Sequence, residues 1–136
     1  MKLEQINPIF VCKLWSQIGP MLAKALEHSA GEYNIDQLKF MLVRGEQILM
    51  VLSDENDQIH GAFCVVFQNY PNDRIVFVTA VGGRRIATAE NWIQLEEWCR
   101  VNGATKIRGA AYESVARLWF QKFGVEQRYI MVEKAL

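Results

Sequence analysis

The chain has 136 residues, and its 15 lysines and arginines balance its 15 aspartates and glutamates, so the formal net charge is zero. Apolar residues make up 51% and charged residues 22%, which is typical of a globular domain and argues against a disordered tail. The balanced charge also argues against a nucleic-acid-binding protein, which needs a basic surface. No apolar run reaches the ~18 residues that would span a bilayer. We therefore expect one domain over residues 1–136, with no nucleic acid and no membrane as partner.

The cysteines and histidines show no metal-binding pattern. Cys12, Cys64 and Cys99 lie far apart, form no Cys-x-x-Cys pair, and have no histidine partner in His28 or His60. Zinc sites need such short spacings, so we expect no metal. An odd number of cysteines among apolar neighbours indicates three reduced thiols in the core. Because the first residues also lack an apolar signal segment, we expect an intracellular, cytoplasmic protein.

The first third of the chain is predicted to be helical. Apolar residues recur at helical spacing from Leu14 to Leu26, and Pro20 interrupts this stripe. Since proline removes an amide donor and clashes with the preceding turn, we expect either a kink or two short helices that meet there. A further helix should begin after Asn34, which can form a capping box with Gln37, and should end at Gly45.

The middle third has the pattern of three strands. Apolar runs cover residues 47–53, 59–68 and 74–81, and polar turn residues separate them at 54–57 and 70–73. The second run is apolar on both faces, which is typical of a central strand covered on both sides. The short polar turns predict an antiparallel meander.

The last third alternates helices and strands. A helix capped by Thr88 is predicted over residues 88–102, followed by a strand at 105–110. A second helix at 113–123 and a final strand at 125–133 follow. The first of these helices would be a crossover connection, so the sheet should become parallel there. The predicted fold class is α/β of the α+β type, with helices on both faces of a mixed, mostly antiparallel sheet.

This order of elements resembles the GNAT fold of the N-acetyltransferases that use acetyl-coenzyme A. The resemblance is best from Val76 to Tyr129 and is carried by two segments. Trp98–Ala104 is similar to the family's helix end before the fifth strand, and Ala116–Gly124 is similar to the helix that follows. The resemblance implies a sheet that is splayed between its fourth and fifth strands, with acetyl-coenzyme A as a possible cofactor. Because one fold can serve many functions, the site has to be considered residue by residue.

The resemblance places a coenzyme site at the turn before the long helix. In the family, the amides of a glycine-containing turn and the helix N-terminus behind it hold the pyrophosphate. Arg84 and Ala89 match the ends of that motif, but Ala87 replaces its first glycine, so the turn is either strained or rearranged. An ordinary helix start with two solvated arginines is the alternative interpretation. The residues expected to contact the coenzyme are Thr79, Val81, Arg84, Arg85, Ala87, Thr88 and Ala89.

The family's proton donor is missing from the sequence. The fourth helix of the family often carries a tyrosine that protonates the departing thiolate, and Phe120, which has no hydroxyl, stands at that position. Glu113 stands where the family often has asparagine, and a carboxylate near phosphates would repel them. Tyr112 is a candidate replacement for the acid, and His60 is a candidate base. The simpler interpretation of His60 is a half-exposed strand residue.

Two functional hypotheses follow from these departures. The first is a non-catalytic GNAT-like module that binds a protein partner or copies of itself. It also resembles, more weakly, the small GNAT-like internal virion or head proteins of short-tailed phages, which would place it inside a virion. This hypothesis predicts no acetyl-coenzyme A binding at tens of micromolar. The alternative is an active N-acetyltransferase acting on a small amine or a protein amine, with water or Tyr112 as proton donor.

Overall fold

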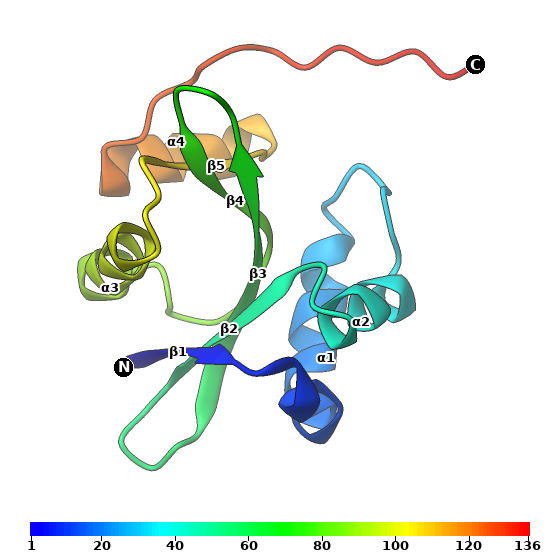
Figure 1. Cartoon of the computed structure of the whole chain (residues 1–136), viewed down its shortest axis with the longest axis vertical. Helices are drawn as coiled ribbons and strands as arrows, with labels where there is room; N and C mark the ends of the chain where they lie inside the picture. Colours follow the sequence, from blue (N-terminus) through cyan, green and yellow to red (C-terminus); the bar gives the residue numbers. More distant parts are fainter.

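The computed structural model describes residues 1–136, and a five-stranded sheet in the order β1-β2-β3-β4-β5 forms its centre (Figure 1). Neighbouring strands are antiparallel from β1 to β4, and β5 lies parallel to β4. This arrangement confirms the predicted meander and the predicted change to parallel pairing. The strands are β1 (Lys2–Ile6), β2 (Ile48–Ser53), β3 (Ile59–Asn69), β4 (Arg74–Gly83) and β5 (Lys106–Gly109). The helices are η1 (Pro8–Phe10), α1 (Val11–Leu26), α2 (Ile35–Val43), α3 (Ala89–Val101) and α4 (Glu113–Phe123).

Helices α1 and α2 lie on one side of the sheet, and α3 and α4 lie on the other (Figure 1). The predicted capping box is present at the start of α2, where the Asn34 side chain accepts from the Gln37 amide and the Gln37 side chain accepts from the Asn34 amide, both at 2.9 Å. A kink or two short helices were expected at Pro20, and α1 is one helix that continues across it, so two separate helices do not form. Ile18 and Leu22 flank Pro20 and are fully buried. Burying each gains about 1.5–3 kcal/mol, which offsets the ~3 kcal/mol that an interior proline costs a helix.

Strand β1 was not predicted, because the first third was expected to be helical throughout. It pairs antiparallel with β2, and the Leu3 amide also donates to the Gln94 side chain at 3.0 Å. The strand has only five residues, and the polar Lys2, Glu4 and Gln5 leave little apolar pattern. Such a short, half-polar edge strand is stabilised by its partner strand rather than by intrinsic preference.

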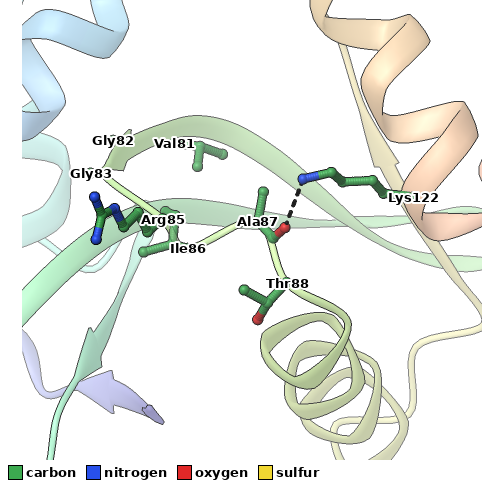
Figure 2. A pocket seen from close by; sticks show the side chains of 8 residues that line it. All are labelled: Val81, Gly82, Gly83, Arg85, Ile86, Ala87, Thr88 and Lys122. Carbon is green, nitrogen blue, oxygen red and sulfur yellow. Dashed lines mark hydrogen bonds between the residues drawn. The ribbon is translucent and has the colours of Figure 1, made fainter.

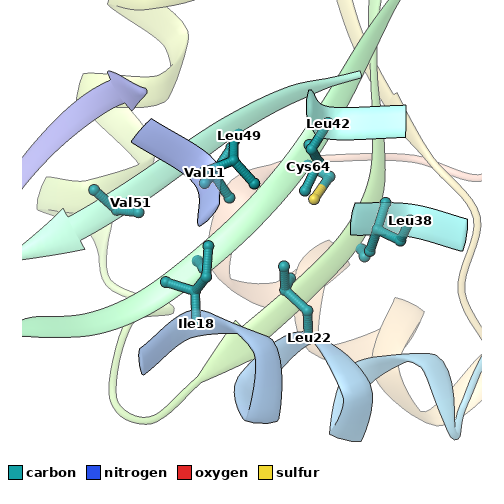
Figure 3. Packing of buried hydrophobic residues seen from close by; sticks show 10 residues of the cluster. Val11, Ile18, Leu22, Leu38, Leu42, Leu49, Val51 and Cys64 are labelled. Atoms are coloured by element: carbon teal, nitrogen blue, oxygen red, sulfur yellow. The ribbon is translucent and has the colours of Figure 1, made fainter. Parts of the chain in front are cut away.

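The hydrophobic core consists of two clusters, one on each face of the sheet. The cluster under α1 and α2 contains Val11, Ile18, Leu22, Leu38, Leu42, Leu49, Val51, Ala62, Cys64 and Ala80 (Figure 3). The cluster under α3 contains Met50, Leu52, Phe63, Val65, Val76, Leu95 and Cys99. Strand β3 contributes to both clusters, which confirms its predicted place at the centre of the sheet.

Two of the three cysteines are core residues, as predicted. Burial raises the pKa of the Cys64 thiol to about 12 and that of the Cys99 thiol to about 11, so neither forms a thiolate readily. Cys12 is exposed, so the expectation of three buried thiols is wrong at this position. It lies in the first turn of α1, next to the fully buried Val11. Neighbouring residues on a helix point in different directions, so Val11 takes the inward position and Cys12 faces solvent.

The C-terminal segment differs most from the prediction. Residues 124–136 form neither helix nor strand, so the strand expected at 125–133 is absent. Figure 1 shows the segment running away from α4, past the β3–β4 turn, to a chain end far from the sheet. Strand preference describes how well residues fit a paired, half-buried surface, and without a neighbouring strand it does not fix a conformation.

Candidate functional site

Strands β4 and β5, at one edge of the sheet, part halfway along β4. Pairing covers Ile75–Val78 against Lys106–Gly109, and then β5 ends while β4 continues to Gly83. The register between β3 and β4 also shifts at this point, where Cys64 faces Ala80 and Val65 faces Val78. Such a bulge bends the strand and changes its direction. The opening predicted between the fourth and fifth strands is therefore present, and it begins at Thr79.

Thr79 occupies the bulge, and its side chain points into the core. Its hydroxyl lies 2.6 Å from Gln47 Oε1 and 3.2 Å from the Cys64 carbonyl oxygen. A hydroxyl has one proton, so it donates to one of these acceptors at a time. Gln47 is only 3% exposed, and its amide nitrogen faces Met41 Sδ at 3.9 Å. The pair therefore holds the bulge in place through a side-chain hydrogen bond.

Beyond the bulge, β4 leads into an open pocket of about 480 Å³. The pocket is lined by Val81, Gly82, Gly83, Arg85, Ile86, Ala87, Thr88 and Lys122 (Figure 2). Four predicted coenzyme contacts are among these residues: Val81, Arg85, Ala87 and Thr88. The other three, Thr79, Arg84 and Ala89, lie next to the pocket in the chain but do not line it.

The turn at the pocket has rearranged around Ala87. Gly83 has a φ of 125° and Arg85 a φ of 57°, while Ala87 has no positive φ. Arg85, and not Ala87, therefore adopts the left-handed conformation in this turn. In a residue other than glycine that conformation costs about 1–2 kcal/mol. The glycines upstream are closely enclosed, since a Cβ atom on Gly82 would collide with the Met21 backbone of α1. The turn is thus held tightly against the sheet and α1.

Helix α3 presents its N-terminus to the pocket. The Thr88 hydroxyl caps the helix by accepting from the Asn91 amide at 3.2 Å, which confirms Thr88 as the predicted cap. The Asn91 side chain donates to the Ile86 carbonyl at 2.8 Å and ties the turn to the helix. The amides of Ala89 and Glu90 have no acceptor within the chain. Free amides at a helix N-terminus, together with the helix dipole, favour an anion.

Lys122 was missed by the sequence analysis. It lies near the end of α4, and its Nζ donates to the Ala87 carbonyl oxygen at 3.3 Å (Figure 2). This contact joins residues 35 positions apart, so no local pattern signals it. With Arg85, it brings a second positive charge to the pocket.

Glu113 lies at the opposite end of α4 from Lys122. The separation of nine positions between them corresponds to about 14 Å of helix. Its carboxylate pairs with Arg117 at 2.6 Å on the exposed surface. It does not line the pocket, so the repulsion of phosphates expected from it has no structural basis here.

The candidate acid and base residues lie outside the pocket. Tyr112 directly precedes α4 and is 61% exposed, and Phe120 is exposed on α4 itself. The His60 ring lies 2.7 Å from Asp54 Oδ2, on the β2–β3 turn. That hydrogen bond from His60 is the main cause that lowers the pKa of Asp54. The backbone carbonyl of His60 accepts from the Arg84 amide at 3.3 Å, and this is its hydrogen bond to the turn at residues 84–88.

Solved structures share this architecture over the whole chain, although no protein-family model and no curated protein matches it. A probable acetyltransferase covers 100% of the chain with 97% of its own length, at a TM-score of 0.69 and 17% identity. A ribosomal-protein-alanine N-acetyltransferase from Brucella melitensis biovar Abortus 2308 covers 98% of the chain with 100% of its own length, at a TM-score of 0.68 and 12% identity. An aminoglycoside acetyltransferase from an uncultured soil metagenomic sample covers 99% of the chain with 95% of its own length, at a TM-score of 0.68 and 14% identity. The chain has a GNAT-like fold.

At these identities the likeness establishes the fold, and the GNAT-like chain's own residues must carry any statement about chemistry. The likeness to these structures does not bear on a virion, so the location in a virion stays a prediction. No cluster of three or more histidine, cysteine or acidic side chains is placed to hold a metal ion. No helix combines the length and apolar character needed to cross a membrane.

Proposed function

We propose that the chain binds a coenzyme A thioester along β4, with the pyrophosphate at the turn of residues 84–88. This proposal rests on one observation: the opening between β4 and β5 and the cationic turn lie one after the other along β4. The opening between β4 and β5 leads directly to a turn with a helix N-terminus and two cationic side chains, Arg85 and Lys122. A long ligand with an anionic end fits such a path, and the neighbouring acetyltransferase structures support the same ligand class.

The residues at the turn fit a pyrophosphate in charge and in hydrogen bonding. Ala89 and Glu90 offer free amides, and Arg85 and Lys122 offer side-chain donors. The Glu90 carboxylate could compete with an anion, but it faces the N-terminal amino group of Met1 at 3.7 Å. Charge-assisted hydrogen bonds of this kind are about twice as strong as neutral ones. These donors support a pyrophosphate at the turn, and the alternative of an ordinary helix start is supported by the exposure of Arg84 and Arg85.

The chain offers little to assist acyl transfer from a bound thioester. The coenzyme itself would supply the activated acyl group and the leaving thiolate. Phe120 cannot donate a proton to that thiolate, and a positioned acid contributes about 10²–10⁴ to a rate. The buried Cys64, with a pKa of about 12, is unsuited to act as a nucleophile. We therefore propose a binding module in which transfer is slow or lost.

An active N-acetyltransferase is the second candidate, and the position of Tyr112 favours it. Tyr112 lies in the short connection between the end of β5 and the start of α4, beside the opening, and its hydroxyl makes no hydrogen bond within the chain. A free hydroxyl there could protonate a departing thiolate. In that case Tyr112→Phe would lower kcat by about 10²- to 10⁴-fold and leave coenzyme affinity unchanged.

Calorimetric titration with acetyl-coenzyme A tests the binding proposal. We expect saturable binding that Arg85→Ala and Lys122→Met each weaken by about tenfold, the loss of one charge-assisted contact of ~1.4 kcal/mol. Arg117→Ala is the matched control, because it removes a cation from α4 that pairs with Glu113 outside the pocket. No binding to the wild-type chain would contradict the proposal and would favour the assembly module.

An acetylation assay separates the two candidates. Thiol release from acetyl-coenzyme A is measured in the presence of small amines and peptide amines. A bound coenzyme with no thiol release above the uncatalysed rate supports the binding module. Release that depends on Tyr112 supports the transferase.

A further inference from the structure

Of the four α-helices, α4 has the least support from the core. The other three each contribute buried residues, whereas α4 contributes none. Only Ala116, Trp119 and Phe123 among its side chains are half-buried, and no side chain caps its N-terminus. Elements with few buried apolar contacts open locally at a lower free energy than the core does. Helix α4 is therefore the helix most ready to open on its own.

Two aromatic contacts hold α4 against the rest of the chain. Phe123 stacks on Trp92 of α3, with the ring centres 4.6 Å apart and the ring planes 8° from parallel. Trp119 lies over Gly109 at the end of β5, where a Cβ atom added to the glycine would be 3.1 Å from the indole. Stacked aromatic rings attract one another beyond the apolar area that they bury. Both contacts lie in the second half of the helix, so that half is the one that is held.

The end of α4 rests on the same short segment that forms the candidate anion site. Lys122 Nζ donates to the Ala87 carbonyl oxygen at 3.3 Å (Figure 2). Trp92, the partner of the aromatic stack, lies in the first turn of α3, directly behind the helix N-terminus that faces the pocket. Both partners belong to residues 87–92. The position of α4 therefore decides whether the Lys122 ammonium stands at the pocket.

We propose that α4 opens and closes on the turn of residues 84–88, and that a phosphate-bearing ligand holds it closed through Lys122. This inference rests on the proposed coenzyme site and adds a moving part to it. The Lys122 ammonium meets the ligand only when α4 is closed, so the closed state binds the ligand more tightly. Such a difference in affinity shifts the population toward the closed state, and any open fraction lowers the apparent affinity. Trp92 and Phe123 are then positioning residues, because they act on the ligand through Lys122.

A double-variant cycle on the full chain tests the positioning role of the stack. Phe123→Ala removes the ring that stacks on Trp92 and should weaken acetyl-coenzyme A binding about fivefold in calorimetric titration. In the Lys122→Met background the same change should alter the affinity by less than about twofold, because the contact through which it acts is gone. Equal weakening in both backgrounds would contradict closure through Lys122.

Phe123→Leu and Phe120→Ala are the matched variants for this cycle. Leucine keeps an apolar side chain on Trp92, so Phe123→Leu should weaken binding less than Phe123→Ala does. Phe120 lies two positions before Lys122, which is about 200° around the helix, and it does not line the pocket, so Phe120→Ala should leave the affinity unchanged. Circular dichroism checks that each variant keeps its helical content. A loss from Phe120→Ala as large as that from Phe123→Ala would overturn the specific role of the stack.

Amide hydrogen exchange measures the closure itself. Acetyl-coenzyme A should slow the amides of residues 117–123 about fivefold or more relative to those of β3, a coupling within the usual range between two linked equilibria. In Lys122→Met, compared at equal ligand saturation, this relative slowing should be lost. Binding without relative slowing in the wild-type chain, or with the same slowing in Lys122→Met, would overturn the closure and leave the coenzyme site standing. No binding to the wild-type chain would overturn both proposals.

Discussion

The meander with α1 and α2 and the segment from β5 to the chain end are stabilised in different ways. In the first region, ten buried residues join two helices to strands β2, β3 and β4. In the second, β5 pairs along four residues, α4 buries no residue, and the last residues bury none. The sheet therefore does not need its C-terminal part in order to have a core. That part brings Lys122 to the candidate site and leaves the outer edge of β5 without a partner strand.

The largest expected contrast concerns leucines on the two sides of this comparison. Leu22 of α1 is fully buried, so Leu22→Ala should lower the free energy of unfolding by about 2–5 kcal/mol through lost burial and a cavity. Leu118 of α4 is 42% exposed, and Leu118→Ala should cost less than about 1 kcal/mol. Urea unfolding followed by circular dichroism measures both. Equal losses would show that α4 is packed as tightly as α1.

A second, smaller effect is expected where the two regions part. Thr79→Val leaves the buried Gln47 Oε1 without its hydroxyl donor, which should cost about 1–3 kcal/mol. Thr79→Ser keeps the hydroxyl and is the control. The double variant with Gln47→Met should cost less than the sum of the two single changes, because no unpaired amide remains. Additive losses in urea unfolding would contradict the coupling of this pair.

The same comparison shows what the sequence could predict. Apolar period and caps predicted α2, α3 and the strands of the meander, because Asn34 and Thr88 act within their own first turn. They failed where tertiary contacts decide, at β1, which depends on β2. The predicted strand at 125–133 failed for the converse reason, since strand-forming residues were present without a partner strand.

The candidate site could be predicted in part. The turn at residues 84–89 was located correctly, because the change from strand to helix is a local signal. The shift of positive φ from Ala87 to Arg85 was not predictable, because arginine has no preference for that conformation. Lys122 was missed because only the folded chain brings α4 to the turn.

A third prediction concerns the contact that ties β5 to the β3–β4 turn. Hydrogen bonds from Lys106 first and Thr105 second lower the pKa of the exposed Asp73 from its ordinary value of 3.8. A carboxyl whose pKa is lowered by folding stabilises the fold at pH above 3.8, and this stability is lost as pH falls through the lowered value. Asp73→Asn should therefore flatten the acid side of the stability curve in urea unfolding between pH 2 and 5, a range set by ~3.9 for a free aspartate. Asp57→Asn, whose carboxylate makes no hydrogen bond or ion pair in the chain, should leave that slope unchanged.

The smallest expected effect on stability belongs to Arg85, where the tight turn and the functional charge conflict. Arg85→Gly relieves the left-handed conformation, worth about 1–2 kcal/mol, but it adds the ~0.5–1 kcal/mol entropy cost of glycine. The net gain should be a few tenths to about 1 kcal/mol in urea unfolding. Coenzyme affinity should fall at the same time, because the variant lacks the guanidinium that lines the pocket. Arg84→Gly is the control, since Arg84 has no positive φ and its loss should lower stability. A stability loss in both variants would mean that Arg85 is not strained, whereas a gain confined to Arg85→Gly would show that the turn keeps an unfavourable residue for the sake of its charge.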